Sequence, residues 1–192
     1  AAGTNVQTYT FNQSTAQKWT LLETEKTLYS IMGKTNVSVS QMVKFYKNKA
    51  TVSYPYSNVS EAPTIEKFCQ IYKEESEVEG VKAEVAFAQA MMETGFLKFG
   101  GDVKKDQYNF AGIGAIGGGS SGAKFDSIRI GIRAHVQHLK AYASKEALKQ
   151  PVVDPRFQYV KRGSAEYVQW LGQKENPNGY GWATALNYGN NI

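Results

Sequence analysis

The chain has 192 residues, a formal net charge of +5 and a hydrophobic fraction of 42%. These values fit one compact domain, with or without an ordered arm, and argue against a disordered protein. The single cysteine excludes a disulfide framework and a zinc site built on several thiolates. No apolar run approaches the roughly 18 residues of a membrane-spanning helix, so we expect no membrane insertion. The positive charge fits a polyanionic partner, such as nucleic acid, anionic lipid or an acidic cell wall, and equally a basic surface that only keeps the protein in solution.

Residues 1–35 are polar, rich in Thr and Asn and weakly periodic, which indicates an arm or linker. We therefore place the domain at residues 36–192. Its first helix is expected after Ser38, which forms a capping box with Gln41. The helix is expected to end before Pro55, because a proline disfavours helical geometry in the residue that precedes it.

Two helices are expected next, on either side of Gly80. The first carries Phe68, Cys69 and Tyr72 at helical spacing, which predicts a packed core thiol rather than a nucleophile. Gly80 is predicted to end this helix. The second is an apolar run that ends at Glu93 and is then broken by a glycine.

The second half of the chain contains two further predicted helices. A long amphipathic helix is expected at residues 128–142, with Asp126 or Ser127 as its N-cap. Ser164 is expected to cap a fourth helix.

Two loops separate and follow these helices. Residues 99–123 hold eight glycines and no helical period, which predicts a long ordered loop. Residues 176–192 are rich in glycine and aromatic residues and are also expected to be loop-like. The prediction is a mainly helical domain whose long glycine-rich loops flank a groove.

Glu93 is the most informative residue, because it is an acid at the end of an otherwise apolar helix. Met91, Met92 and Phe96 surround it in sequence, so loss of water and the negative end of the helix dipole would both raise its pKa. A carboxyl group that keeps its proton near neutral pH is what a general acid needs. The alternative is an exposed polar end to an amphipathic helix.

Four segments carry a recognisable pattern in chain order: Ala88-Gln89-Ala90-x-x-Glu93-Thr94-Gly95-Phe96, Tyr108-Asn109-Phe110-Ala111-Gly112-Ile113-Gly114, Phe125-Asp126-Ser127 and Trp182-Ala183-Thr184-Ala185-Leu186-Asn187-Tyr188. Together they resemble family 73 glycoside hydrolases, the endo-β-N-acetylglucosaminidases that cut peptidoglycan. The resemblance covers about residues 65–192 and is strongest to the catalytic domain of clostridial and bacillar cell-wall autolysins.

The resemblance implies a lysozyme-like helical fold and hydrolysis of the β-1,4 bond from N-acetylglucosamine to N-acetylmuramic acid. Glu93 matches the catalytic acid of the family and would protonate the leaving oxygen. The resemblance also implies a secreted enzyme of the bacterial cell wall that acts on peptidoglycan glycan strands. We expect a monomer without metal or cofactor and without a nucleic-acid partner.

The second carboxylate of the family is missing from its usual place. Family members often carry a glutamate on a hairpin before the long helix, and residues 115–124 hold no acid. The candidates are Asp126, otherwise a helix cap, and Asp102 and Asp106, otherwise surface charges. A two-carboxylate mechanism needs one of them about 5–9.5 Å from Glu93. The alternative, which the short interval favours, is assistance by the substrate's own 2-acetamido group.

Further residues are expected at the substrate. In the family a tyrosine of the C-terminal motif lies beside the acid. Tyr188 matches the final tyrosine of that motif and Trp182 takes the place of the first, which leaves two candidates for the ring at the reacting sugar. Tyr188 is assigned a catalytic role, although clustered aromatic residues are often core residues. The residues predicted to bind substrate are Gln89, Asn109, Phe110, Tyr180 and Trp182. Asn109 either binds an acetamido group or holds its own turn. His135 and His138 lack a third ligand at metal spacing, so we expect solvated or polar-face residues rather than a zinc pair.

Two other functions fit the same residues. A non-catalytic cell-wall glycan-binding module is suggested by the missing second carboxylate. A lysozyme-like muramidase or lytic transglycosylase would keep the fold and cut a different bond, and a single acid suits a transglycosylase.

Overall fold

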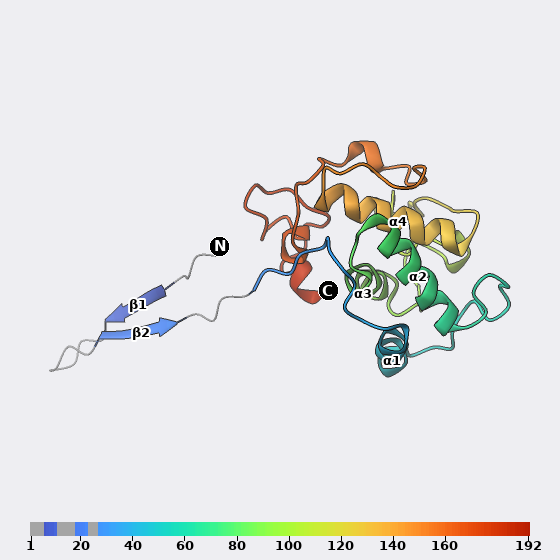
Figure 1. Ribbon diagram of the computed structural model, residues 1–192, viewed down its shortest axis with the longest axis horizontal. Coiled ribbons are helices and arrows are strands. Elements are labelled where there is room, and N and C mark those ends of the chain that lie inside the picture. Colours follow the sequence, from blue (N-terminus) through green and yellow to red (C-terminus); the bar gives the residue numbers. More distant parts are fainter. Residues whose placement is uncertain (1–5, 11–17, 23–26) are drawn as a thin grey trace.

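The computed structural model describes residues 6–10, 18–22 and 27–192. The prediction of a mainly helical domain is confirmed, and the architecture is consistent with a lysozyme-like helical domain. The α-helices of the described part are α1 (Val39–Lys49), α2 (Ile65–Glu79), α3 (Ala83–Thr94) and α4 (Ile128–Ala143) (Figure 1). Four 3-10 turns accompany them, namely η1 (Lys105–Gln107), η2 (Phe157–Tyr159), η3 (Val168–Leu171) and η4 (Gly189–Asn191).

The N-terminal region contains an antiparallel pair of strands that the sequence analysis did not predict. Strand β1 (Val6–Thr10) pairs with β2 (Lys18–Leu22), with Val6 opposite Leu22 and Thr10 opposite Lys18 (Figure 1). The rest of residues 1–26, and with it much of the predicted arm, lies outside the described residues.

The end of the predicted arm packs on the domain. Ser30 forms a bridge with Tyr167, and Met32 forms a bridge with Val81. Between them, Ile31 is fully buried in the core. The boundary predicted after residue 35 therefore falls inside the packed domain, because an apolar residue in a polar stretch of sequence anchors the chain earlier than composition indicates.

The predicted helix ends are largely confirmed. Ser38 and Gln41 form the capping box that starts α1, and Gly80 ends α2 in the left-handed conformation. Of the two candidates for the N-cap of α4, Ser127 is the one whose side chain accepts a hydrogen bond from the helix, from Ile130 N. Gly95, also left-handed, ends α3 directly after Thr94.

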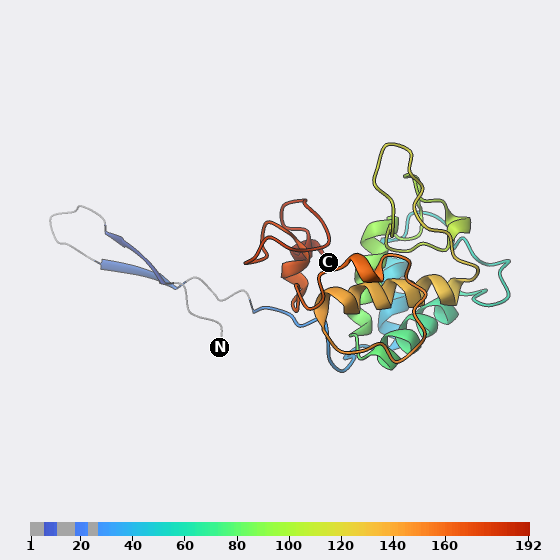
Figure 2. The ribbon, with the colours of Figure 1, turned by 90° about the horizontal axis from the view of Figure 1, so that it is seen from above.

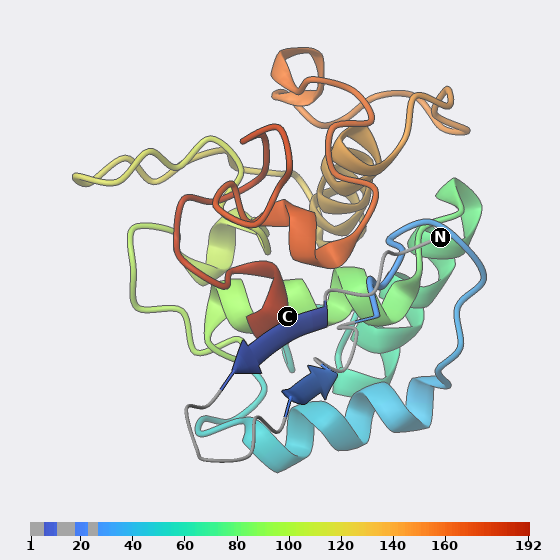
Figure 3. The same ribbon diagram turned by 90° about the vertical axis from the view of Figure 1, so that its left-hand side faces the viewer.

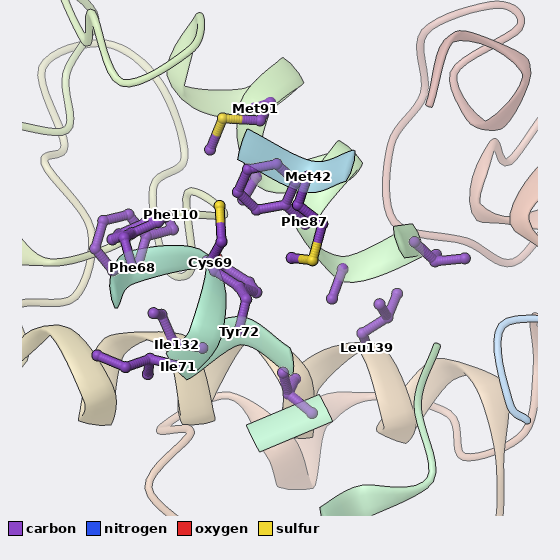
Figure 4. Packing of buried hydrophobic residues seen from close by; sticks show 14 of the residues in the cluster. Met42, Phe68, Cys69, Ile71, Tyr72, Phe87, Met91, Phe110, Ile132 and Leu139 are labelled. Atoms are coloured by element: carbon purple, nitrogen blue, oxygen red, sulfur yellow. The ribbon is translucent and has the colours of Figure 1, made fainter. Parts of the chain in front are cut away.

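The core forms around α2, which contacts α1, α3 and α4. Phe68, Cys69 and Tyr72 are fully buried, and Phe110 from the long loop packs on Phe68 with ring centroids 5.1 Å apart (Figure 4). Burying one such large side chain contributes about 1.5–3 kcal/mol. The prediction that Cys69 is a core thiol is confirmed, and burial raises the pKa of that thiol.

Buried charges join α2 to α4. Glu75 accepts hydrogen bonds from Arg129 and Arg133, and Glu79 accepts one from Lys140 at 3.0 Å. Neither side chain of the Glu79–Lys140 pair is exposed to solvent. These pairs hold α4 in register against α2.

The predicted fourth helix is wrong. At the predicted position the chain makes only η3, and Tyr167 rather than Ser164 precedes that turn. The Ser164 hydroxyl is buried and has no hydrogen-bond partner among the described residues, while the backbone nitrogen atoms of Ala165 and Val168 donate to the carbonyl oxygen atoms of Tyr142 and Tyr29. Hydrogen bonds to distant segments therefore replace the local ones that a helix would need.

The long loop of residues 99–123 contains no α-helix, as predicted, and holds only η1. Its glycine-rich part rises from the helical body (Figure 2).

No helix in the described part of the chain has both the length and the apolar character needed to cross a membrane.

Candidate active site

Glu93 lies in the last turn of α3, and the C-terminal segment of the chain lies against this helix (Figure 3). The Tyr188 hydroxyl donates a short hydrogen bond to Glu93 Oε1, and Tyr188 itself is only 7% exposed. Two residues that are 95 positions apart therefore meet, as the expected role of Tyr188 beside the acid requires. Burial, followed by the neighbouring Glu93, raises the pKa of Tyr188, so the phenol keeps its proton.

Glu93 as a whole residue is exposed to solvent. Its carboxyl group, however, is surrounded by enough protein to lose part of its contact with water. Burial raises the pKa of Glu93 above its ordinary value, and the hydrogen bond from Tyr188 opposes this shift without cancelling it. Among the described residues, no cation forms an ion pair with Glu93. The carboxyl group is accessible, and its raised pKa favours the protonated form.

The two oxygen atoms of Glu93 have different surroundings. Oε1 accepts from Tyr188, whereas Oε2 lies 3.9 Å from the position that a Cβ atom of Gly112 would take. Gly112 has a φ of +63°, a conformation that favours glycine, and its missing side chain leaves Oε2 uncovered. A proton on this carboxyl group would therefore sit on Oε2.

A buried hydrogen-bond chain continues from Tyr188 into the core. Gln89 Nε2 donates to Tyr188 Oη at 2.9 Å, and Gln89 Oε1 lies 2.8 Å from His135 Nε2. His135 Nδ1 lies 3.0 Å from the hydroxyl of Tyr72. Burial, with a smaller effect of His138, lowers the pKa of His135 to about 3, so its ring is neutral.

The direction of this chain follows from its chemistry. Because Gln89 Oε1 can only accept, the neutral ring of His135 carries its hydrogen on Nε2. Nδ1 then accepts from Tyr72, and every donor in the chain points towards Glu93. The chain fixes Gln89 and hence the hydroxyl that holds Glu93.

Two expectations are corrected here. His135 is fully buried and is not a polar-face residue, and Gln89 is also fully buried, so it holds Tyr188 instead of contacting a substrate. The signal for His135 was present, since Ile128, Ile132, His135 and Leu139 share one helical stripe.

The loop residues that were predicted to bind substrate have structural roles. Asn109 is 1% exposed; its Nδ2 donates to the Ile113 carbonyl oxygen and its Oδ1 accepts from Ile113 N. Of the two roles left open for Asn109, the structure shows the one that holds the turn, which carries Gly112. Phe110 is 1% exposed within the aromatic core. Side chains buried to this degree offer no surface to a glycan.

The aromatic residues of the C-terminal segment differ from one another. Trp182 is partly buried. Its ring packs edge-on against the ring of His138, with centroids 4.7 Å apart, and lies 5.6 Å, centroid to centroid, from the ring of Tyr142. Tyr180 is exposed, and Lys161 Nζ lies 4.0 Å from the centre of its ring. One face of Tyr180 is therefore already covered by a cation.

No candidate for a second carboxylate interacts with Glu93 in the described part of the chain. Asp126 is exposed and lies just before α4, where Ser127 is the N-cap. Asp102 accepts a hydrogen bond from Gly119 N at 3.4 Å, which links two parts of the long loop.

His138, which packs against Trp182, also has a carboxylate partner. The buried side chain of Asp154 places Oδ2 at 2.7 Å from His138 Nδ1. His138 is therefore held by a carboxylate and is not a solvated residue.

A polar hollow of about 250 Å³ opens next to the acid, between the long loop and the end of α4. Its lining includes Gly112, His138, Tyr142, Arg156, Tyr159 and Trp182. Sequence reasoning did not single out Tyr142, Arg156 and Tyr159 as site residues, since they come from a helix and a connection without a motif. Within the described residues, no group of three or more His, Cys, Asp or Glu side chains is arranged to hold a metal ion.

Comparisons with known proteins give one family and one relative. The model of a family described as mannosyl-glycoprotein endo-beta-N-acetylglucosaminidase matches residues 69–192. The chain is also 52% identical over 103 residues to an uncharacterized protein of Borreliella burgdorferi. That match covers 54% of this chain and 50% of the relative, so the matched region is about half the length of each protein. No solved structure matches the chain.

Proposed function

The chain belongs to the glucosaminidase family, a family of endo-β-N-acetylglucosaminidases, and on this premise we propose that it hydrolyses peptidoglycan. The bond cut is the β-1,4 bond from N-acetylglucosamine to N-acetylmuramic acid, and Glu93 is the general acid. The observation that carries the proposal is an accessible carboxyl group whose pKa is raised by burial and that has no cationic partner among the described residues.

The proton on Glu93 Oε2 passes to the leaving glycosidic oxygen as the bond breaks. Positive charge then develops on the anomeric carbon of the N-acetylglucosamine unit. Gly112 supports this role because it leaves Oε2 free to approach the substrate. Tyr188 supports it because its hydroxyl holds Oε1 and stabilises the carboxylate once the proton has left.

The 2-acetamido group of the substrate takes the place of a second protein carboxylate. Its carbonyl oxygen attacks the anomeric carbon as the leaving group departs, which gives a cyclic oxazolinium intermediate. Water then opens this ring and gives a proton to the Glu93 carboxylate, which restores the acid. The support for this route is the absence of a second acid that contacts Glu93 in the described part of the chain.

The remaining parts of the proposal concern the setting. The enzyme acts as a monomer, outside the cell, on the glycan strands of the bacterial cell wall. The net charge of +5 supports an acidic wall polymer as the substrate.

Digestion of purified peptidoglycan by the wild type and by Glu93→Gln, followed by mass spectrometry, tests the proposal. We expect fragments that end in reducing N-acetylglucosamine from the wild type and none from the variant. Fragments with muramic-acid ends would indicate a muramidase, and anhydro-muramic ends a lytic transglycosylase. Binding without any fragment from either protein would indicate a glycan-binding module.

A further inference from the structure

The polar hollow beside Glu93 contains a cation that the proposed chemistry does not use. Arg156 lines this hollow together with Gly112 and Trp182. The position that a Cβ atom of Gly112 would take is 3.9 Å from Glu93 Oε2, so Gly112 lies between the hollow and the acid and the two are neighbours.

Among the described residues, the Arg156 guanidinium has no carboxylate partner. In the described part of the chain it forms no ion pair within 4.0 Å, and its recorded contact is with the ring of Tyr159, 4.5 Å away. The nearby acid, Asp154, is already occupied: Oδ2 pairs with His138 Nδ1, and Oδ1 accepts from the backbone nitrogen of Arg156. Asp154 therefore anchors the backbone of Arg156 and does not pair with its guanidinium.

We propose that this hollow binds a carboxylate attached to a sugar, namely the lactyl carboxylate of an N-acetylmuramic acid next to the cleaved bond, with Arg156 as the group that recognises it. The inference rests on the proposed function, because in an alternating glycan strand each N-acetylglucosamine has a muramic acid on either side. A guanidinium can hold a carboxylate with two parallel hydrogen bonds, which makes it selective for this group.

The rest of the lining suits a sugar that carries such a group. Tyr142 and Tyr159 contribute phenols, and Trp182 contributes an aromatic ring against which the C–H face of a sugar can pack. The volume of about 250 Å³ is below the usual range for sites that hold drug-sized ligands, about 300–1,000 Å³. A single sugar with its substituent fits this size better than a sugar that carries a stem peptide.

A free lactyl carboxylate exists only after the stem peptide has been removed. In intact peptidoglycan this carboxylate is part of an amide bond and carries no charge. The class of reaction that must supply the preferred substrate is therefore hydrolysis of the lactyl–peptide amide. The inference predicts an enzyme that acts on peptide-free strands in preference to peptide-bearing ones.

The test compares two substrates that differ only in this charge: peptide-free glycan strands, and the same strands with their carboxylates converted to methyl esters. The enzymes are the full chain, Arg156→Gln, and Lys44→Gln as a control that removes one positive charge from the exposed face of α1. We expect wild type and Lys44→Gln to favour the charged strands. Arg156→Gln is expected to lower the ratio of kcat/KM for charged over esterified strands by about tenfold, from the loss of a charge-assisted hydrogen bond.

A second measurement separates this inference from the proposed function. In a Glu93→Gln background the strands stay intact, so calorimetry can measure their binding with and without Arg156→Gln. A loss of affinity of about tenfold that is confined to the charged strands supports the inference. Equal affinities for charged and esterified strands, or an equal loss for both, would overturn it. If the wild type releases no N-acetylglucosamine ends but binds the charged strands through Arg156, the proposed function fails and the carboxylate site stands.

Discussion

Two glutamates on successive helices show how environment gives one residue type two roles. Glu75 on α2 is 3% exposed, and Arg129, Arg133 and Gln150 donate hydrogen bonds to it. Burial works to raise the pKa of Glu75, but these donors outweigh it and lower the pKa. Within the part of the chain that the structure describes, Glu93 on α3 has a single donor, the phenol of Tyr188, and burial raises the pKa of Glu93.

The difference lies in the partners and not in the loss of water alone. A carboxylate that is paired with cations is fixed in its charged form and joins two helices. A carboxyl group that is held by one neutral donor can keep a proton and can also release it.

The largest effect is expected from Glu93→Gln, which preserves the shape of the side chain and removes the proton donor. We expect kcat to fall by about 10²- to 10⁴-fold, the range that a general acid contributes. The assay is release of reducing ends from peptidoglycan, with circular dichroism to show that the fold is retained. Turnover within tenfold of the wild type would show that another group supplies the proton.

The buried Glu79–Lys140 ion pair is expected to contribute to stability, in contrast to Glu93. Lys140→Met leaves Glu79 buried without its cation, and we expect the free energy of unfolding to fall by about 3 kcal/mol. The matched control is Lys47→Met, whose pair with Glu66 is exposed and should contribute about 0–1 kcal/mol. Urea denaturation measures both. Similar losses from the two variants would remove the distinction between buried and exposed charges.

Tyr188→Phe should alter the acid without removing it. The hydroxyl of Tyr188 lowers the pKa of Glu93, so its loss should raise that pKa further. Because the protonated form is the active one, the alkaline limb of kcat/KM should move to higher pH. We also expect kcat to fall by about tenfold, since Oε1 and Gln89 Nε2 lose their partner. Tyr180→Phe is the control, and an identical shift of the limb in that variant would contradict the assignment.

The smallest effect concerns the stability of Glu93→Gln itself. Because the folded state raises the pKa of Glu93, ionisation costs more in the folded than in the unfolded chain. This group favours folding below the unfolded pKa, the ordinary glutamate value of 4.5, and the contribution is lost as pH rises through the higher folded pKa. At pH 7 the variant should therefore be at least as stable as the wild type, as thermal unfolding at pH 4 and pH 7 can show. Glu75→Gln should instead destabilise at pH 7.

The sequence predicted the features that are encoded locally. The capping box at Ser38, the left-handed Gly80 and the buried Cys69 depend on neighbours in the chain, and all three are confirmed. Glu93 stood out for the same reason, because its helix is apolar and a glycine follows.

Features that depend on distant residues were predicted less well. The stretch after Ser164 has the residue pattern of a helix. Two of its backbone nitrogen atoms nevertheless donate to the carbonyl oxygen atoms of Tyr29 and Tyr142, which no local pattern could reveal. His135 was assigned to a polar face, although its partners Tyr72 and Gln89 come from α2 and α3. These misses share one physical cause, the satisfaction of polar groups across the fold.

The most direct test of the contrast between the two glutamates is a ¹³C NMR titration of the glutamate side-chain carboxyl groups. Comparison with Glu93→Gln and Glu75→Gln identifies the two signals. We expect Glu93 to titrate above the ordinary glutamate pKa of 4.5 and Glu75 to titrate below it. A midpoint for Glu93 at or below 4.5 would contradict the claim that this carboxyl group is the one that keeps its proton for the reaction.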